Sequence, residues 1–553
     1  MAKSRDCATA DDMVQDDNPR RSGAGGPSTF EDAAATAVVE EQTPLLGQQQ
    51  SQVQDELDQL RVQLRPKVTV LCFLLLIMLE LGAGMAAPPT NSMMEKILCS
   101  QIHPESSRES TLPWGQGGAD DPCKSPDVQG CLAMLRGWYY TFEAIPGLLC
   151  AVPYGILSDC WGRKPVLVLG VLGFSLSAGF NLVVFLLSDF IPLRVTWFGA
   201  LFLFIGGTAQ MVVAMLYTFL ADVTPVAERA TVFFQIAAAF LVSNMIASAL
   251  AGVLMAKSDW LALDISIALL FFGLPLGFAF PETLHLHASR MKKARQERLD
   301  RRANLESAGG AEEEEEGVFA SKRTVVQDLW LKARDSLAEV WEFVLGNKSL
   351  SFLILSTVFV ILGKFVTEML LQYATKRYGW TWSGATLLLT VRSAASLVTL
   401  LGLLPLAGRL CVARFGMSSM SKDLWLARLS GAFGVIGCLI IALAGSGEIL
   451  CVGLVWLSLG VGLSQLTRSL LNSLIEEHHV GIVNSLMSLM EQGGVMLAGP
   501  LLGKSLSVGM ELGGPWIGLP FMVAAVFLTA ATTIVCLFRL PARARSVPAG
   551  IER

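Results

Sequence analysis

The sequence predicts an all-α, multi-pass membrane protein with about twelve transmembrane helices in two six-helix bundles. Of the 553 residues, 52% are hydrophobic and only 16% are charged, which is more apolar than an ordinary soluble domain. The apolar residues gather in runs of the roughly 20 residues that a helix needs to cross a bilayer. These runs form two groups of six with a long polar stretch between them.

The chain begins with a polar tail, residues 1–67, which we expect to be disordered and cytoplasmic. The first apolar run follows this tail, too far along the chain for a cleaved signal peptide, and is expected to remain as a span. Hydropathy predicts spans at 68–87, 137–157, 165–187, 196–220, 231–255, 262–280, 349–374, 383–405, 425–444, 449–472, 480–502 and 516–538.

The spacing of the spans predicts the domains. One bundle covers 68–284, a cytoplasmic linker covers 285–348, a second bundle covers 349–538, and 539–553 form a cytoplasmic tail. The linker segregates a basic run from an acidic one, a pattern that cannot bury an apolar core. Near its end, apolar residues recur every three or four positions, so 325–344 are expected to form an amphipathic helix on the inner membrane surface.

The distribution of cations predicts the orientation, because loops rich in Lys and Arg stay on the cytoplasmic side. Such loops precede the first span, follow the second, separate the eighth from the ninth and follow the twelfth, so both termini should be cytoplasmic. The cations are Arg61, Arg65, Lys67, Arg163, Lys164, Arg409, Arg414, Lys422, Arg539, Arg543 and Arg545.

The turn after the second span reads YGILSDCWGRKP, residues 154–165. Gly155 and Gly162 permit a tight turn and a close approach of helices. Asp159 could accept backbone N–H groups at a helix start, or form with Arg163 an ionic latch that is made in one conformation and broken in another. The alternative is that Arg163 and Lys164 only set the topology.

The order Gly155-x-Leu157-x-Asp159-x-x-Gly162-Arg163-Lys164 closely resembles the loop signature of the major facilitator superfamily. The resemblance covers the apolar body, 68–538, and implies the superfamily's fold and a transporter that switches between outward-facing and inward-facing states. It also implies a part in this switch for Asp159 and Arg163. The stretches DVTPVAERA at 222–230 and PETL at 281–284 resemble patterns of fungal members.

The chain departs from the superfamily's proton-coupled members at two places. The Arg that many of them carry early in the fourth span has no counterpart before Gly206 and Gly207. The Gly-Pro signature of antiporters is missing from the fifth span at 248–255, while a similar stretch occurs at 493–503. The sequence therefore leaves import and export open.

Ionisable residues inside spans are costly and mark candidate sites for substrate and protons. Two neutral polar side chains, Gln210 and Asn244, join this set. The third, sixth, ninth and twelfth spans have no ionisable residue near their centres, as expected of the outer, lipid-facing helices that the resemblance implies. The ionisable candidates are Glu80, Glu143, Lys364, Glu368, Arg392, Arg468 and Glu491.

The charge count within the spans predicts proton coupling. The spans contain four carboxylates and three cations, which leaves one acid without a partner. Such an acid readily carries a proton. Glu143 and Glu80 are the better candidates because neither has a cation one turn away. Lys364 and Glu368, four residues apart, can simply pair.

These features predict a secondary active transporter of a small, partly apolar organic solute, coupled to protons and working by alternating access. An uncoupled facilitator and a transporter-like nutrient receptor are the alternatives. The five His residues show no arrangement of nucleophile and base, so an enzyme is not expected. Nor do we expect a cofactor, a metal or a nucleic-acid partner, and the protein should be a monomer in the lipid bilayer.

Two further features are a possible disulfide in the first external loop and a possible signal for sorting to a particular membrane. Cys99, Cys123 and Cys131 share the first external loop, where two of them can form a disulfide and leave the third free. Glu41, Leu45 and Leu46 match an acidic dileucine signal for a sorting adaptor. The plasma membrane and the vacuolar membrane both remain open as destinations.

Overall fold

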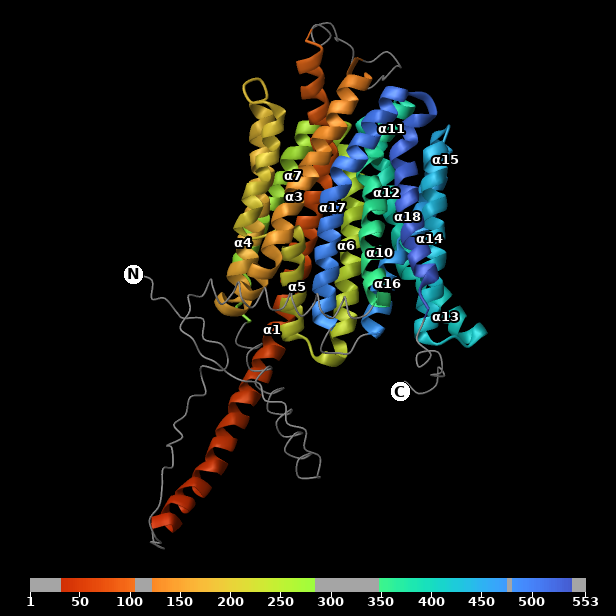
Figure 1. Cartoon of the computed structure of the whole chain (residues 1–553). Helices are drawn as coiled ribbons and strands as arrows, with labels where there is room; N and C mark the ends of the chain where they lie inside the picture. Colours follow the sequence, from red (N-terminus) through yellow and green to blue (C-terminus); the bar gives the residue numbers. More distant parts are fainter. Residues whose placement is uncertain (1–30, 105–121, 284–347, 475–479, 540–553) are drawn as a thin grey trace, which may run out of the picture.

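The computed structural model describes residues 31–104, 122–283, 348–474 and 480–539, and these ranges are almost entirely helical. Figure 1 shows two bundles side by side, one from each half of the chain. Ten described helices are long and apolar enough to span a membrane, and α3 and α17, with 36 and 33 residues, provide two further spans. The predicted all-α, multi-pass fold is confirmed.

The first bundle contains six helical spans. The fourth is interrupted between η2 and α5, where Gly207 adopts a φ of 86° that favours glycine. A Cβ on the neighbouring Gly206 would lie 2.1 Å from the carbonyl carbon of Leu169 in α4, so a glycine is needed for this close approach. The elements are α1 (Glu31–Ile102), η1 (Pro122–Lys124), α3 (Pro126–Trp161), α4 (Arg163–Leu186), η2 (Leu193–Ile205), α5 (Ala209–Val223), α6 (Val226–Met255) and α7 (Asp259–Phe278).

The second bundle also contains six spans, and several of them change helix type. A 3₁₀ turn separates α10 from α11, and the π-helical segment η4 precedes Pro405 at the start of α13. The elements are α10 (Lys348–Lys364), η3 (Phe365–Met369), α11 (Leu370–Tyr378), α12 (Trp382–Val398), η4 (Thr399–Leu403), α13 (Leu404–Phe415), α14 (Ser419–Leu443), α15 (Gly447–Leu459), α16 (Gly462–Leu474), α17 (Val480–Leu512), η5 (Gly514–Gly518) and α18 (Leu519–Leu537).

The helices α1, α3 and α17 each extend ten or more residues beyond an end of their predicted spans. α3 begins at Pro126 rather than 137 and α17 ends at Leu512 rather than 502, because a hydropathy window excludes polar residues that are buried between helices. α1 begins at Glu31, inside the tail expected to be disordered, where the many Ala, Glu and Gln residues have high helix propensity.

Several predictions fall outside the described part of the chain. The side chains of the dileucine signal at 41–46 are not described, although its backbone belongs to α1. The linker from 285 to 347, with the amphipathic helix expected at 325–344, and the tail from 540 to 553 also lie outside the described residues.

The most extensive contacts between the bundles come from two pairs of helices: α3 packs against α17, and α6 packs against α12. The first contact is backbone to backbone, because a Cβ on Gly137 would lie 2.5 Å from the carbonyl oxygen of Gly499. Small residues permit such close packing of membrane helices.

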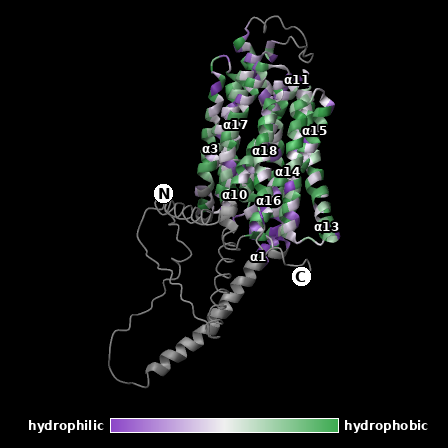
Figure 2. Ribbon diagram, turned by 45° about the vertical axis from the view of Figure 1, so that its right-hand side comes forward, coloured by the Kyte–Doolittle hydropathy of each residue, from purple (hydrophilic) through white to green (hydrophobic). Residues whose placement is uncertain are grey.

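The two ends of the molecule differ in how the bundles meet. We call the end that carries the 155–164 turn the signature end, and the opposite end, with Cys99 and Cys123, the disulfide end. The largest apolar cluster contains side chains from both bundles, among them Leu132 and Leu370 near the disulfide end. Two other clusters, around Leu216 and around Leu470, each belong to one bundle only. The ribbon in Figure 2, coloured by residue hydropathy, shows that hydrophobic residues predominate along the helices and that hydrophilic ones are more frequent toward the ends.

Candidate functional site

A cavity of about 230 Å³ lies inside the first bundle against the second. Apolar residues form much of its wall, and polar groups from α1, α3 and α4 enter it. The second bundle contributes one lining residue, Glu368 of η3. The polar and aromatic lining residues are Thr90, Asn91, Arg136, Tyr139, Tyr140, Glu143, Phe174, Ser177, Asn181, Phe185 and Glu368.

Glu143 and Glu368 bring two predicted site residues together across the bundles. Glu143 is partly buried and has no hydrogen-bond or ion-pair partner among the residues that the structure describes. Glu368 accepts a hydrogen bond of 3.0 Å from the Tyr140 hydroxyl, and its charge acts on Glu143. Two carboxyls at one cavity repel each other when both are ionised, which favours a proton on one of them.

Arg136 also lines the cavity and was missed by the sequence analysis. The predicted second span began at 137, one residue too late, although Leu132, Ala133 and Leu135 before Arg136 are apolar. Arg136 adds a fourth cation to the three that the sequence analysis counted against four carboxylates, so that count no longer leaves one acid over. The case for Glu143 therefore rests on its missing partner and not on the balance of charges.

The remaining predicted charges gather in the second bundle. Arg468 and Glu491 form an ion pair of 3.3 Å between α16 and α17. Lys364 interacts electrostatically with Glu491, and Arg392 with Glu368. These contacts leave Glu368 and Glu491 with cationic neighbours, unlike Glu143.

Three predicted site residues lie apart from this group. Glu80 is half-buried in α1, one turn from the cavity residue Ala83, and has no ion-pair partner in the described ranges. Gln210 is exposed at the start of α5. Asn244 accepts a hydrogen bond of 3.3 Å from Ser393, a contact that joins α6 to α12.

The signature turn is held by two acidic side chains from elsewhere in the first bundle, Asp222 of α5 and Glu282 after the end of α7. Arg163 lies 3.7 Å from Asp222 and donates a hydrogen bond of 2.8 Å to Ser158. Glu282 accepts the backbone N–H groups of Arg163 and Lys164 at the start of α4. The side chain of Asp159 lies outside the described residues, so its predicted contact with Arg163 stays a prediction.

Gly162 is required in this turn for two reasons. Its φ of 115° is rarely adopted by other residues, and a Cβ there would lie 2.5 Å from a carboxylate oxygen of Glu282. Gly155, in contrast, has open space on this side, because a Cβ on its backbone would meet no heavy atom within 4 Å.

The sequence profile of the Major Facilitator Superfamily matches residues 134–499, about two thirds of the chain and both bundles. The chain belongs to the major facilitator superfamily. It is therefore a membrane transporter and not an enzyme.

Relatives and solved structures agree with this family. The chain is 30% identical to the MFS efflux pump atnC of Emericella nidulans over 485 residues, which cover 86% of this chain and 88% of the relative. It is 28% identical to the efflux pump ustT of Aspergillus flavus over 449 residues, 79% of this chain and 82% of the relative. The fold resembles the D-xylose-proton symporter (TM-score 0.56, 12% identity, 87% and 99% covered) and the nucleoside transporter NupG (0.55, 12%, 86% and 100%).

A polar network joins the bundles between the cavity and the disulfide end. Glu95, only 5% exposed, accepts hydrogen bonds from Lys124, Gln129 and Trp382, the last from the second bundle. Gln372 donates to the Gln129 carbonyl at 2.8 Å. We call these five residues the Glu95 network.

The disulfide lies directly beside this network. Cys99 and Cys123 are joined, with their Cα atoms 5.1 Å apart, and Cys131 has a free thiol. Cys123 precedes Lys124, whose ammonium reaches Glu95 at 2.6 Å and whose carbonyl accepts from Lys376 of the second bundle. The crosslink therefore limits how far Lys124 can move from α1.

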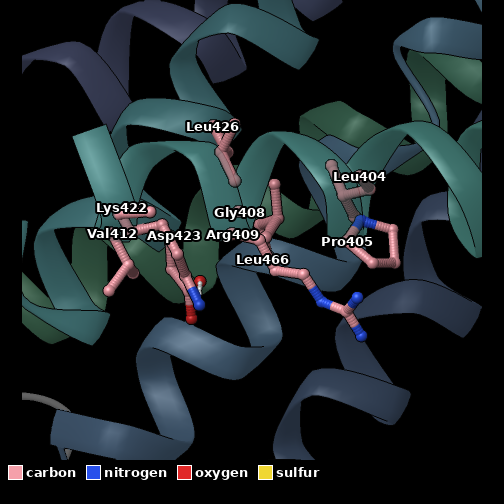
Figure 3. Close-up of a pocket in the computed structure, with 10 residues that line it drawn as sticks. Leu404, Pro405, Gly408, Arg409, Val412, Lys422, Asp423, Leu426 and Leu466 are labelled. Atoms are coloured by element: carbon pink, nitrogen blue, oxygen red, sulfur yellow. Dashed lines mark ion pairs between the residues drawn. The ribbon is translucent and has the colours of Figure 1, made fainter. Parts of the chain in front are cut away.

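Figure 3 shows a second hollow, a groove of about 620 Å³ near the signature end of the second bundle. It is bounded by α13, α14 and α16, and Asp423 pairs with Lys422 at 3.3 Å on its wall. Arg409 is exposed and extends away from this pair. Because the first bundle contributes no lining residue, the groove is not a place where both bundles contact a solute.

Proposed function

We propose that the chain exports small organic solutes in exchange for protons, as a secondary active transporter with alternating access. The two relatives named as efflux pumps support export. The cavity of the first bundle, which Glu368 of the second bundle also lines, supports a central site, because transporters of this kind bind their solute at the interface of the two repeats.

The observation that carries proton coupling is the position of Glu143. It lines the cavity, has no partner among the described residues and faces the charge of Glu368 in the other bundle. A bound proton removes the negative charge of this carboxylate, and with it both the cost of burying that charge and its repulsion by Glu368. Glu80, the other candidate from the sequence, does not line the cavity, and we therefore assign the proton to Glu143.

Alternating access is supported by the difference between the two ends. The bundles share one apolar cluster and the Glu95 network toward the disulfide end, whereas the clusters around Leu216 and around Leu470 each belong to a single bundle. Opening of the disulfide end requires that the shared contacts break while each bundle keeps its own core. The signature turn would change its contacts in the same step.

We further propose that the disulfide end faces the exterior and that both termini are cytoplasmic. The cations of the signature turn support this orientation, as does the disulfide, which persists in an oxidising compartment. The protein would act as a monomer in the plasma membrane or the vacuolar membrane. A sorting adaptor that reads Glu41, Leu45 and Leu46 would choose between them.

Purified protein in liposomes tests proton coupling. With a solute that the parent protein exchanges at equal pH on both sides, an imposed pH gradient should drive accumulation against the concentration gradient. Glu143→Gln should abolish the gradient-driven flux and keep the exchange at saturating solute, because a neutral amide fills the same space but cannot release a proton. Glu80→Gln is the matched control and should retain both activities.

Other outcomes identify the alternatives. Flux in the parent protein that ignores the pH gradient would indicate an uncoupled facilitator, and no flux with retained solute binding would indicate a receptor. Unchanged gradient dependence in Glu143→Gln would show that another group carries the proton.

A further inference from the structure

Arg136 and Glu143 place one cation and one carboxyl on the same face of the same helix. They are seven residues apart in α3, which is two turns, so they lie about 10 Å apart along the helix axis. Both line the cavity, with the aromatic side chains of Tyr139 and Tyr140 between them in the sequence. The cavity therefore has a positive group toward the disulfide end and an acidic group farther inside.

The charge of Arg136 is not matched by a carboxylate. Arg136 is 2% exposed and donates hydrogen bonds to the Glu368 carbonyl at 2.7 Å, the Gln372 amide oxygen at 3.4 Å and the Tyr140 hydroxyl at 3.5 Å, all of them neutral acceptors. Its Nε is buried without a partner, and no ion pair involves Arg136 in the described part of the chain. A buried guanidinium without an anion is costly, and an anionic group of a ligand would offset that cost.

The charges of the cavity residues limit which charged groups a bound solute can carry. A solute with only an acidic group would add a negative charge beside Glu143 and Glu368. A solute with only a basic group would leave Arg136 without its anion. A solute with both groups satisfies Arg136 and Glu143 together and keeps the charge of the cavity unchanged.

We propose that the transported solutes are zwitterions whose acidic group binds Arg136 and whose basic group binds Glu143, about 10 Å away. An extended chain of three amino-acid residues spans about this distance. The apolar wall, including Phe174 and Phe185, accommodates an apolar body between the charged groups. The inference rests on the proposed function, in that the solute's basic group and the proton compete for Glu143, as exchange requires.

Three peptides of one length test this inference: Gly-Phe-Gly with free ends, its N-acetyl form and its C-terminal amide. Binding to the purified full-length protein is measured by isothermal calorimetry. We expect the free peptide to bind the parent protein at least about tenfold more tightly than either blocked form, because each block removes one charge-assisted hydrogen bond.

Two variants make the test specific for each charge. In Arg136→Gln, the amide should bind as well as the free peptide, while the acetyl form remains weak. In Glu143→Gln, the acetyl form should bind as well as the free peptide. Arg409→Gln, which changes an exposed cation outside the cavity, should keep the pattern of the parent protein.

The inference is overturned if the free peptide does not bind, or if the blocked forms bind the folded parent protein equally well. It is also overturned if both variants keep the parent's preference. Loss of gradient-driven flux is a separate result: a parent protein with the expected peptide pattern but no proton coupling would contradict the proposed function and leave the zwitterion site in place.

Discussion

Glu95 shows how one buried residue can connect the two bundles. Its carboxylate lies between Lys124 of the disulfide-linked segment and Trp382 of the second bundle. Removal of one partner from a buried ion pair leaves the other charge unsatisfied, and the loss usually exceeds the value of a surface pair. Glu95 therefore joins the two bundles at the disulfide end, and under the proposed alternating access it would stabilise the state that is closed there.

We expect Glu95→Ala to lower the stability of this closed state by about 3 kcal/mol, since Lys124 loses its buried counter-charge. The apparent melting temperature of the purified protein should fall accordingly. Glu448→Ala removes an exposed carboxylate from the first turn of α15 and should leave the melting temperature unchanged. Equal melting temperatures for both variants would contradict a stabilising role of Glu95.

At the scale of elements, the contact of α3 with α17 determines how closely the bundles approach. Glycines at 137, 499 and 503 bring the two backbones together, and the contact continues to Gly130, where a Cβ would lie 3.7 Å from the Cβ of Ser507. This separation is within the range of a disulfide. The pair is therefore placed to report whether these helices must separate during transport.

A Gly130→Cys/Ser507→Cys variant, in a Cys131→Ser background, should form a disulfide on mild oxidation and lose transport in sealed vesicles of native orientation. Each single cysteine variant should remain active. A reductant that cannot cross the membrane should restore transport when added outside, if the disulfide end faces the exterior. Full activity of the crosslinked protein would show that α3 and α17 need not part, and rescue only from inside would reverse the proposed orientation.

At the scale of the whole molecule, each bundle has an apolar cluster of its own, and a third cluster joins the bundles. This distribution supports the proposal that 68–284 and 349–538 are separate folding units that associate through a shared surface. The proposed boundary between them is the linker at 285–348, of which only residue 348 is described.

We expect the two halves, divided after Glu316 and expressed together, to assemble and transport, because the contacts between them do not require a continuous chain. Gradient-driven flux and copurification of the halves provide the measurement. Either half expressed alone should insert but not transport. Stable, inserted halves that never associate would contradict the proposed division.

The sequence by itself determined the number, type and approximate position of the helices, because apolar length is a local property of the chain. It also determined the grouping into two bundles and the signature turn that identifies the superfamily. Only the tertiary structure decided which polar groups meet. Arg136 was missed because its burial depends on η3, more than two hundred residues away.

Two other contacts show the same limit. Lys364 and Glu368 have helical spacing in the sequence, but the 3₁₀ turn of η3 places them differently, and they form no ion pair within the described residues. The sequence placed three cysteines in one predicted loop and left their pairing open. The packing of α1 against the start of α3 brings Cys99 and Cys123 together. Hydropathy is summed along the chain, whereas pairing depends on distances between segments that only the packed bundles define.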